Sequence, residues 1–512
     1  MSFKKDVNMK SFKTPPASYW IESVEQKEYP VLNNDIKTDV LIIGGGMTGI
    51  TAASILKEAG VKLVMLEARK ILQGTTGNTT AKVTSQHHLI YHYLISKFGV
   101  EKAHQYAEAN QSAIEFIAKR VTDLNIHCDF ERKSAYVYTE SDSFIKNIEN
   151  ETDSALKLGI PAEFVTESTL PFQIKCAVKF NNQAQFHPLK YLLKLLENIE
   201  GDDCHIYENT QALSIEGSSP YTVITDRGKV EANKVIVATH YPIFDKPGLY
   251  FARLYQSRSY IIGAKVTNTL PDGMFISADG PTHSFRTQPT DNGQMLLVAG
   301  EDHKTGQGDN TILHYERLKQ YAERIYNIES IDYHWSAQDC MPVDSVPFIG
   351  KLSPNSENLY VATGFKKWGM TNSTVSAMLL SDLILERPNP WLDVFNPNRF
   401  NIAASAEEIT SQNLNTAGKL VGGILNIPSD ELETVFMGEG KIIKLNNKKL
   451  AIYRDHDNHL HAVSPYCTHL GCEIKWNDAE KTWDCPCHGS RYSIDGDVIE
   501  GPTVKNLERI EL

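Results

Sequence analysis

Three closely spaced glycines near the amino terminus constrain the fold of this 512-residue chain more than any other feature. Gly44, Gly46 and Gly49 lie between a short β-branched run and a helix-compatible stretch, and a second apolar run ends in Glu67. This order predicts a strand, a glycine turn, a helix and a second strand. Such a turn lets the backbone approach a pyrophosphate at the start of the helix, while Glu67 can accept hydrogen bonds from a ribose. The unit therefore predicts a dinucleotide site, and the glycines alone do not distinguish FAD from NAD.

The chain up to about residue 395 alternates between strand-like and helical segments. Residues 235–239 and 359–363 have the apolar character of buried strands, and the second runs into a glycine turn and a helix over about 371–386. Residues 91–120 have amphipathic helical spacing, and strand-like segments alternate with loops from about 130 to 300. This part is expected to combine an α/β unit with an α+β unit.

A linker is expected after this region. Pro388, Pro390 and the pair Asn396-Pro397 favour irregular backbone. Residues 405–408 have the Ser-x-x-Glu form of a helix capping box, so a connecting helix is expected from there to about Leu425. Beyond it, short strands separated by Asn, Asp and Gly predict an all-β unit.

Half of the eight cysteines lie in two short boxes near the carboxyl terminus. The boxes read Cys-Thr-His-Leu-Gly-Cys from Cys467 and Cys-Pro-Cys-His-Gly-Ser from Cys485, and together they have the spacing C-x-H-x15-C-x2-H. Each box offers a thiolate and an imidazole, so two facing loops can hold two irons, one bound by cysteines and the other by histidines. A zinc site with the same ligands is the alternative, but zinc explains neither the second cysteine of each box nor the Ser-x-Tyr after the second box.

This region closely resembles the Rieske [2Fe-2S] domain. The resemblance implies one cluster per chain, in which Cys467 and Cys485 bind one iron while His469 and His488 bind the other. The boxes therefore predict a redox centre that carries one electron at a time.

The resemblance also assigns the remaining polar residues of the two boxes. It implies a disulfide between Cys472 and Cys487, as in the respiratory type of Rieske protein, and two reduced thiols are the alternative in a cytosolic protein. Ser490 and Tyr492 match residues whose hydroxyl groups donate hydrogen bonds to a bridging sulfide and to a ligand sulfur. Such hydrogen bonds stabilise the reduced cluster and raise its potential.

Three motifs of the amino-terminal part resemble the FAD-dependent oxidoreductase family that includes D-amino-acid oxidase, glycine oxidase and sarcosine oxidase. They are Ser-Tyr-Trp at 18–20, Gly-Thr-Thr-Gly-Asn-Thr-Thr-Ala at 74–81, and a distal segment from Asp344 to Gly369. The resemblance covers roughly residues 18–395 and implies FAD rather than NAD. In that family the turn at 369–371 meets the flavin ring, and N–H groups of the following helix stabilise negative charge on reduced flavin. The residues expected to bind FAD are Gly44, Gly46, Met47, Thr48, Gly49, Glu67, Thr75, Thr76, Ala81, Ala212, Thr239, Gly364, Gly369, Met370 and Thr371.

Two residues are candidates for contact with a substrate. Arg286 could pair with a substrate carboxylate, and Lys366 follows a turn near the expected flavin face. A structural salt bridge for Arg286 and solvent exposure for Lys366 are the alternatives. The chain departs from the family at His240, where a small residue is usual, and the family's lysine or cysteine for oxygen activation or flavin attachment cannot be placed. Use of O2 and covalent flavin therefore stay open.

Composition excludes several classes of partner. The chain has 51 Lys and Arg against 63 Asp and Glu, a net charge of −12, and no basic run, which argues against a nucleic-acid or anionic-membrane surface. No secretory signal or transmembrane segment is predicted, so a cytoplasmic protein is expected.

The predicted architecture is a Rossmann-like α/β FAD-binding domain with an α+β substrate domain, plus a carboxyl-terminal all-β Rieske domain. The oxidoreductase is expected over 1–395, the linker and connecting helix over 396–426, and the Rieske domain over 427–512. Within the oxidoreductase, the FAD-binding parts are expected at about 36–90, 175–245 and 335–395, and the substrate domain at about 91–174 and 246–334.

The predicted function is a dehydrogenase that oxidises an amino acid or a secondary amine, and that passes electrons through the cluster to an unknown acceptor. An electron carrier or redox sensor without a small-molecule substrate is the alternative. A reductase fed by NAD(P)H ranks third, because no second glycine fingerprint follows a strand elsewhere.

Overall fold

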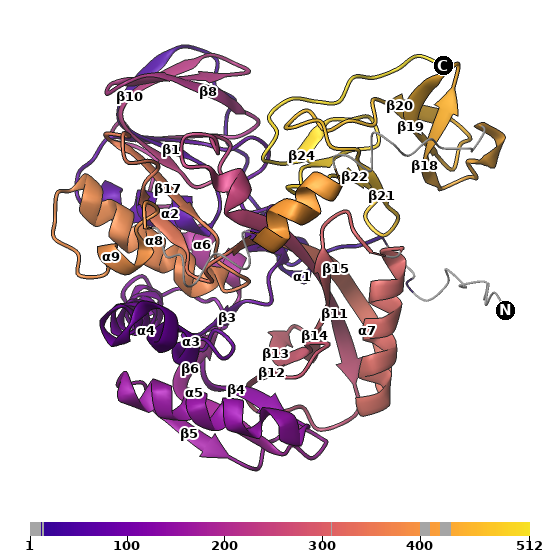
Figure 1. The fold of residues 1–512 in the computed structure, drawn as a ribbon. Helices are drawn as coiled ribbons and strands as arrows, with labels where there is room; N and C mark the ends of the chain where they lie inside the picture. The colour runs from indigo at the N-terminus through magenta and orange to yellow at the C-terminus, as the bar shows by residue number, and fades with distance from the viewer. Residues whose placement is uncertain (1–11, 13–14, 309, 400–409, 420–431) are drawn as a thin grey trace.

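The computed structural model describes residues 12, 15–308, 310–399, 410–419 and 432–512 of the chain (Figure 1). Two large sheets lie in the amino-terminal part, and two small sheets form the carboxyl-terminal part. This arrangement confirms the expected fold class, in which an α/β unit and an α+β unit precede a separate all-β unit. None of the described helices is both long enough and apolar enough to cross a bilayer.

The first large sheet is built around β1 (Ile36–Ile43), the strand that leads into the glycine turn. β1 pairs in parallel with β2 (Leu63–Leu66) and β10 (Lys229–Val237), and β10 pairs in parallel with β17 (Leu359–Thr363). Every residue of β2 and β17 is buried, as expected for a parallel sheet covered on both faces. The other strands of this sheet are β7 (His205–Tyr207), β8 (Ala212–Gly217), β9 (Tyr221–Thr225) and β16 (Phe348–Lys351).

Two helices that are distant in the sequence pack together beside this sheet. α2 (Met47–Glu58) follows the glycine turn, and α8 (Gly369–Ile384) follows the second predicted turn. They lie in contact, and α6 (Pro188–Leu196) packs against α2. The distal segment therefore packs against the first β-α-β unit, as the expected grouping of 36–90 with 335–395 implies.

The second large sheet has nine strands in the order β15-β11-β14-β13-β12-β4-β6-β3, with β5 paired to β6. Its long strands β11 and β15 form the antiparallel pair that faces the carboxyl-terminal part in Figure 1. The strands are β3 (Lys82–Val83), β4 (Glu131–Thr139), β5 (Ala162–Val165), β6 (Cys176–Gln185), β11 (Leu254–Val266), β12 (Met274–Ser277), β13 (Ser284–Thr290), β14 (Gly293–Lys304) and β15 (Ile328–Pro342).

Helices cover this sheet at both ends. The predicted helical stretch at 91–120 forms two helices, α3 (Tyr91–Phe98) and α4 (Val100–Asp123), because Gly99 turns the chain between them. α5 (Ile145–Lys157) packs against β5 and β6, while α7 (Ile312–Ile325) packs against β11 and β14.

The boundaries between the two sheets differ from the expected ones. Residues 175–245 were expected in the FAD-binding part, but β6 pairs with β4 of the second sheet. The second half of β15, from residue 335 on, was also expected in the FAD-binding part, but it pairs with β11 of the second sheet. Strand character is local in the sequence, whereas membership of a sheet depends on pairing with distant strands.

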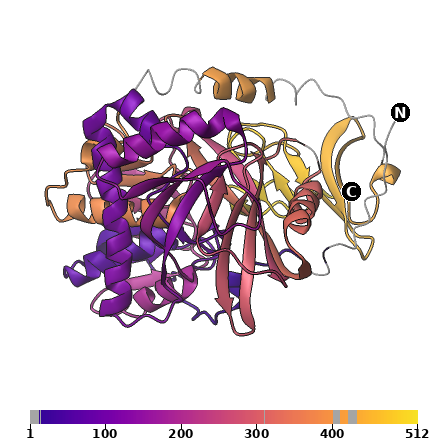
Figure 2. The ribbon, with the colours of Figure 1, turned by 90° about the horizontal axis from the view of Figure 1, so that it is seen from below.

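The carboxyl-terminal part consists of two small antiparallel sheets. One contains β18 (Gly440–Leu445), β19 (Lys448–Arg454) and β20 (Leu460–Val463), and the other contains β21 (Lys475–Asn477), β22 (Thr482–Asp484), β23 (Arg491–Tyr492) and β24 (Val498–Glu500). Residues 410–419 of the expected connecting helix are helical, and Figure 2 shows them along the outside of the molecule. The capping box at 405–408 and the expected helix end at Leu425 lie outside the described residues.

Candidate flavin and iron–sulfur sites

The glycine turn has no room for side chains. An added Cβ at Gly44 would overlap the carbonyl group of Ala238, and one at Gly49 would overlap the carbonyl oxygen of Gly44. Gly44 also has a φ of 118°, which favours glycine. The backbone of β1 therefore lies directly against the end of β10, and this packing leaves the start of α2 open to a phosphate group.

Glu67 stands at the end of β2 next to this turn. Its Oε2 accepts a hydrogen bond from Gly45 N at 2.8 Å, and its Oε1 accepts one from Arg69 N at 3.0 Å. Burial raises the pKa of Glu67, and these two N–H groups lower it. The carboxylate is thus fixed at the mouth of the turn, where a ribose hydroxyl can donate to it.

A cavity runs from this turn across to the start of α8 and reaches the second sheet. Eleven of the predicted FAD-binding residues line it: Gly44, Gly46, Met47, Thr48, Glu67, Thr75, Thr76, Ala212, Thr239, Gly369 and Met370. The first N–H groups of α8 have no partner inside the helix, so they can stabilise negative charge at this end of the cavity. His240, the departure from the family, also lines the cavity. Its Nε2 atom is buried and has no hydrogen-bond partner in the described part of the chain, so the cavity offers a polar atom to FAD.

Four predicted FAD-binding residues do not line the cavity. Gly49 packs against the glycine turn, and Gly364 has a φ of 77° and packs against Pro342. Thr371 donates from Oγ1 to the carbonyl of Thr84 at 3.0 Å. Ala81 is fully buried. These residues pack behind the residues that line the cavity and do not line it themselves.

Distant side chains hold the loop at 74–81 in place by binding its carbonyl groups. Ser18 Oγ donates to Gly77 O at 2.5 Å, and Trp20 Nε1 donates to Thr79 O at 2.7 Å. Trp335 Nε1 donates to Asn78 O at 3.1 Å. Two residues of the Ser-Tyr-Trp motif therefore hydrogen-bond to the FAD loop, although the motif lies more than fifty residues before that loop.

Arg286 belongs to the same set, and the structure does not bring it to the cavity where contact with a substrate carboxylate was predicted. Its Nη1 donates to the carbonyls of Thr80 and Ala81, both at 2.9 Å, and its Nε donates to Thr287 O at 3.1 Å. Its Nη2 donates to Gln288 Oε1. Because these acceptors occupy its donors and Arg286 does not line the cavity, the structure favours a structural role for this side chain.

Lys366 is also not in the cavity. Its Nζ donates to Ser345 Oγ at 2.9 Å, whereas the next residue, Lys367, lines the cavity and pairs with Asp302 at 3.2 Å. Both lysines have positive φ, so the turn sends consecutive side chains in different directions. At this turn, the lysine that lines the cavity is therefore Lys367 and not Lys366.

A second lysine, Lys82, lines the cavity and was not indicated by any sequence motif. Lys82 Nζ donates to Ser284 Oγ at 2.6 Å and to Phe275 O at 3.2 Å. Burial, and then the charge of Arg286, lower the pKa of Lys82 to about 7. Since Lys82 follows the FAD loop directly, only the pairing of β3 with β6 reveals that it reaches the second sheet.

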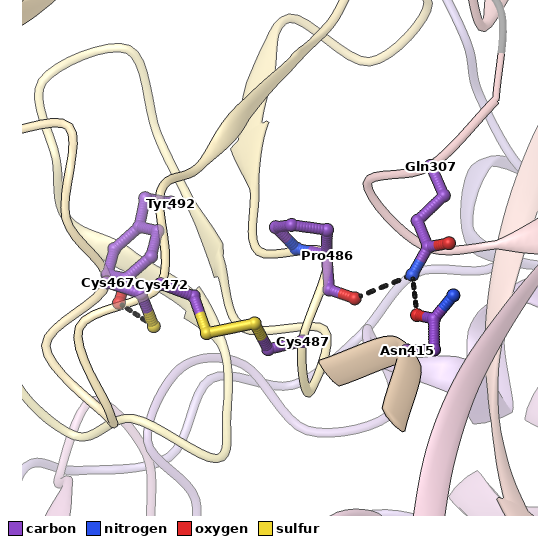
Figure 3. Close-up of a disulfide and its surroundings, with 7 residues drawn as sticks. All are labelled: Gln307, Asn415, Cys467, Cys472, Pro486, Cys487 and Tyr492. Carbon is purple, nitrogen blue, oxygen red and sulfur yellow. Dashed lines mark hydrogen bonds between the residues drawn. A yellow bond between two sulfur atoms is a disulfide. The ribbon is translucent and has the colours of Figure 1, made fainter. Parts of the chain in front are cut away.

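The two cysteine boxes form facing loops. Cys472 and Cys487 are joined by a disulfide, which links the loops (Figure 3). Cys467 and Cys485 form no disulfide. Tyr492 OH donates to Cys467 Sγ at 3.1 Å. Hydrogen bonds with the Cys485 thiol, and then with Tyr492 and Ser490, lower the pKa of the Cys467 thiol.

The histidines complete a donor set that fits a [2Fe-2S] cluster. The rings of His469 and His488 lie 5.0 Å apart and perpendicular, and both residues are largely buried. Nδ1 of His469 is buried without a hydrogen-bond partner among the described residues, so it is free to bind a metal. With two free thiols on the same loops, one of them already hydrogen-bonded by a tyrosine, the residues match the ligands of a Rieske cluster.

The outer edges of both histidines face the oxidoreductase part. His469 Nε2 lies 2.9 Å from Oδ2 of Asp245, and His488 hydrogen-bonds to the backbone of Phe251. Burial lowers the pKa of His488 to about 4. The loop before β11 thus covers the ligand edge of the cluster site.

Comparisons with known proteins agree with this geometry. A family model for FAD dependent oxidoreductases matches residues 39–383, and a model for the Rieske [2Fe-2S] domain matches residues 426–511. YhfW of Bacillus subtilis (strain 168), named as a Rieske 2Fe-2S iron-sulfur protein, is 44% identical over 98% of this chain and 98% of its own. Gamma-glutamylputrescine oxidoreductase of Escherichia coli (strain K12) is 22% identical over 72% of this chain and 88% of its own.

The fold is also similar to solved structures. Glycine oxidase from Geobacillus kaustophilus has a TM-score of 0.59 at 16% identity, and the match covers 71% of this chain and 99% of that one. The match to the Rieske family model decides against the zinc alternative for the cysteine boxes. The cofactors are FAD and a [2Fe-2S] cluster. The chain belongs to the FAD-dependent oxidoreductase family and carries a Rieske domain at its carboxyl end.

Proposed function

We propose that the protein is a dehydrogenase that oxidises an amino acid or a secondary amine and passes the electrons from FAD through the Rieske cluster to a one-electron acceptor. The observation that carries this proposal is the burial of the cluster's histidine edge against the oxidoreductase part, at Asp245 and Phe251. When bound, FAD takes two electrons from a substrate, and the cluster carries them one at a time. Two molecules of acceptor are therefore reduced for each substrate molecule oxidised.

The cavity favours an enzyme over an electron carrier. A carrier needs no space for a small molecule beside its flavin, but this cavity extends to polar residues of the second sheet. Among them are Thr282, Ser284 and Asp302, which come from the β12–β13 loop, β13 and β14. Such a mixture of apolar and convergent polar groups is typical of substrate sites.

The charges in the cavity support a substrate that carries both a carboxylate and an amine. Lys82 makes no ion pair within the described residues, and its Nζ lies among neutral oxygen atoms, so it can receive a carboxylate. Asp302 also lines the cavity, where it pairs with Lys367, and its carboxylate can receive an amine. Gamma-glutamylputrescine oxidoreductase and glycine oxidase, the similar proteins, are named for substrates of this kind.

The test is anaerobic addition of glycine, sarcosine, proline and gamma-glutamylputrescine to the purified full-length protein. Flavin absorbance and the electron paramagnetic resonance of the cluster are recorded together. The proposal expects one compound to bleach the flavin and then to produce a reduced Rieske signal. In a Cys467→Ser variant, the same compound is expected to bleach the flavin without any cluster signal. If dithionite reduces both centres but no amine reduces either, the dehydrogenase proposal fails.

A further inference from the structure

One glutamine contacts both cofactor sites. Gln338 lies on β15, is only 3% exposed and lines the FAD cavity. Its backbone carbonyl accepts a hydrogen bond from Oγ1 of Thr75, a residue of the FAD loop, at 3.2 Å. Its side-chain Nε2 donates to the carbonyl of Gly489 at 2.9 Å. Gly489 lies between His488, a predicted iron ligand, and Ser490, a predicted donor to the cluster.

The orientation of the Gln338 amide is set by its neighbours. Thr305 Oγ1 donates to Gln338 Oε1 at 2.8 Å, and Arg258 Nη2 approaches the same oxygen at 3.4 Å. A reversed amide would place an NH2 group against these two donors and an oxygen against the carbonyl of Gly489. Only one orientation satisfies all three partners, so Nε2 donates to the cluster loop.

The cluster loop approaches β11 and β15 as closely as a backbone can. A Cβ added at Gly489 would overlap the side chain of Gln256 and would lie 3.3 Å from Gln338 Nε2. On the other side of the loop, Gln307 Nε2 donates to Pro486 O at 3.0 Å and to Asn415 Oδ1 at 2.9 Å (Figure 3). The loop at 485–490 is therefore held by β11 and β15 on one side and by Gln307 on the other. Gln307 also binds the linker helix through Asn415.

We propose that Gln338 is a positioning residue that couples the two cofactor sites, because it fixes the cluster loop against the wall of the FAD cavity. The inference rests on the proposed function. The step that it serves moves one electron, which leaves reduced flavin and converts one ferric ion of the cluster to ferrous. No bond of Gln338 forms or breaks. Since electron tunnelling weakens steeply with distance and with gaps between bonded groups, loss of this contact slows the transfer.

The test uses the full-length protein with both cofactors and needs no substrate. The bound flavin is photoreduced without oxygen by a laser flash, with EDTA as the electron donor, and the absorbance of both centres is followed in time. In Gln338→Leu, the reduction of the cluster is expected to slow about tenfold, since small misplacements of reacting groups commonly cost that much or more. FAD content, cluster content and the midpoint potential of the cluster are expected to match those of the wild type.

The matched control is Gln256→Leu. Gln256 also packs against Gly489, but its amide donates to Cys340 Sγ at 3.2 Å rather than to the cluster loop. This variant is expected to transfer electrons at the wild-type rate. If Gln338→Leu does not retain its cofactors, Thr305→Val decides, because it removes a donor that orients the amide while keeping the side-chain shape. It is expected to slow the transfer in the same direction but less.

The outcomes distinguish this inference from the function on which it rests. A wild-type transfer rate in Gln338→Leu or, where that variant loses its cofactors, in Thr305→Val would overturn the role of Gln338 alone. A rate that falls equally in Gln256→Leu would also overturn it, because the effect would then follow from packing and not from the hydrogen bond. If photoreduced flavin in the wild-type protein never reduces the cluster, the proposed function itself fails.

Discussion

Nε2 of His469 lies 2.9 Å from Oδ2 of Asp245, and both side chains are less than a tenth exposed. A predicted iron ligand of the Rieske domain is therefore paired with a carboxylate of the FAD-dependent oxidoreductase. Because Nε2 donates to Asp245, the tautomer leaves Nδ1 free for iron. The oxidoreductase part thus completes the surroundings of the cluster site.

This pairing predicts that Asp245→Asn raises the reduction potential of the cluster. A carboxylate beside the cluster disfavours the more negative reduced state, so its removal makes reduction easier. At an effective dielectric constant near 20, the expected rise is about 50 to 100 mV. The measurement is a redox titration followed by electron paramagnetic resonance, and Asp245→Glu, which keeps the charge, is the control. An unchanged or lower potential in Asp245→Asn would contradict this account.

A second prediction concerns the hydrogen bond from Tyr492 to Cys467. Tyr492 OH lies 3.1 Å from Cys467 Sγ, and a donor there stabilises the extra electron of the reduced cluster. Tyr492→Phe is therefore expected to lower the potential by about 50 mV, the equivalent of one hydrogen bond of about 1 kcal/mol, without loss of iron. Tyr453→Phe, on β19 of the same domain, serves as the control and is expected to leave the potential unchanged. Equal potentials for wild type and Tyr492→Phe would contradict the role assigned to the hydrogen bond from Tyr492.

Much of this architecture could be predicted from local sequence patterns. The turn at Gly44 and the boxes at Cys467 and Cys485 need particular residues at short spacings, because each is a single loop whose chemistry is local. The disulfide, too, followed from the resemblance to the respiratory Rieske type, and the structure contains it. Such features can be predicted because the residues that define them lie close together in the sequence.

The residues that join sites could not be predicted in the same way. Asp245 precedes His469 by 224 positions, and Gln338 reaches Gly489 only because β15 pairs with β11 under the cluster loop. Arg286 shows the converse. An arginine on a strand of the substrate sheet resembles a carboxylate ligand until the carbonyls that occupy its guanidinium are known. Long-range pairing, which a single sequence does not encode visibly, decides such roles.

The structural role of Arg286 gives a third prediction. Arg286→Met leaves the carbonyls of Thr80 and Ala81 buried without their donor, so it is expected to lower the free energy of unfolding by about 2 to 4 kcal/mol. Because those carbonyls belong to the FAD loop, flavin is also expected to dissociate more readily. Flavin fluorescence during heating measures both effects. A variant with normal thermal stability and flavin retention, but with a weakened affinity for substrate, would restore the carboxylate-binding role.

The last prediction concerns the pH dependence that Lys82 creates. Burial lowers the pKa of Lys82 from 10.5 to about 7 in the folded protein. Between about pH 7 and pH 10.5 the unfolded chain therefore holds a proton that the folded chain lacks, so stability rises with pH across this window. Lys82→Met removes the proton and its cost. The variant is expected to unfold about 2 to 4 °C higher than wild type at pH 7, while the two converge near pH 10.

If the unfolding temperatures of wild type and Lys82→Met converge at high pH, the effect comes from the lost proton site and not from better packing. A methionine that simply packs better would raise the midpoint equally at every pH, whereas removal of a buried proton site helps only where the unfolded lysine is charged. Lys37→Met, an exposed lysine on β1, is the control and is expected to leave the pH profile of unfolding unchanged. A parallel shift of the Lys82→Met curve from pH 7 to pH 10 would show that Lys82 is protonated in the folded protein. In that case its ammonium group already has a counter-charge in the cavity, and an incoming substrate carboxylate would have to displace it.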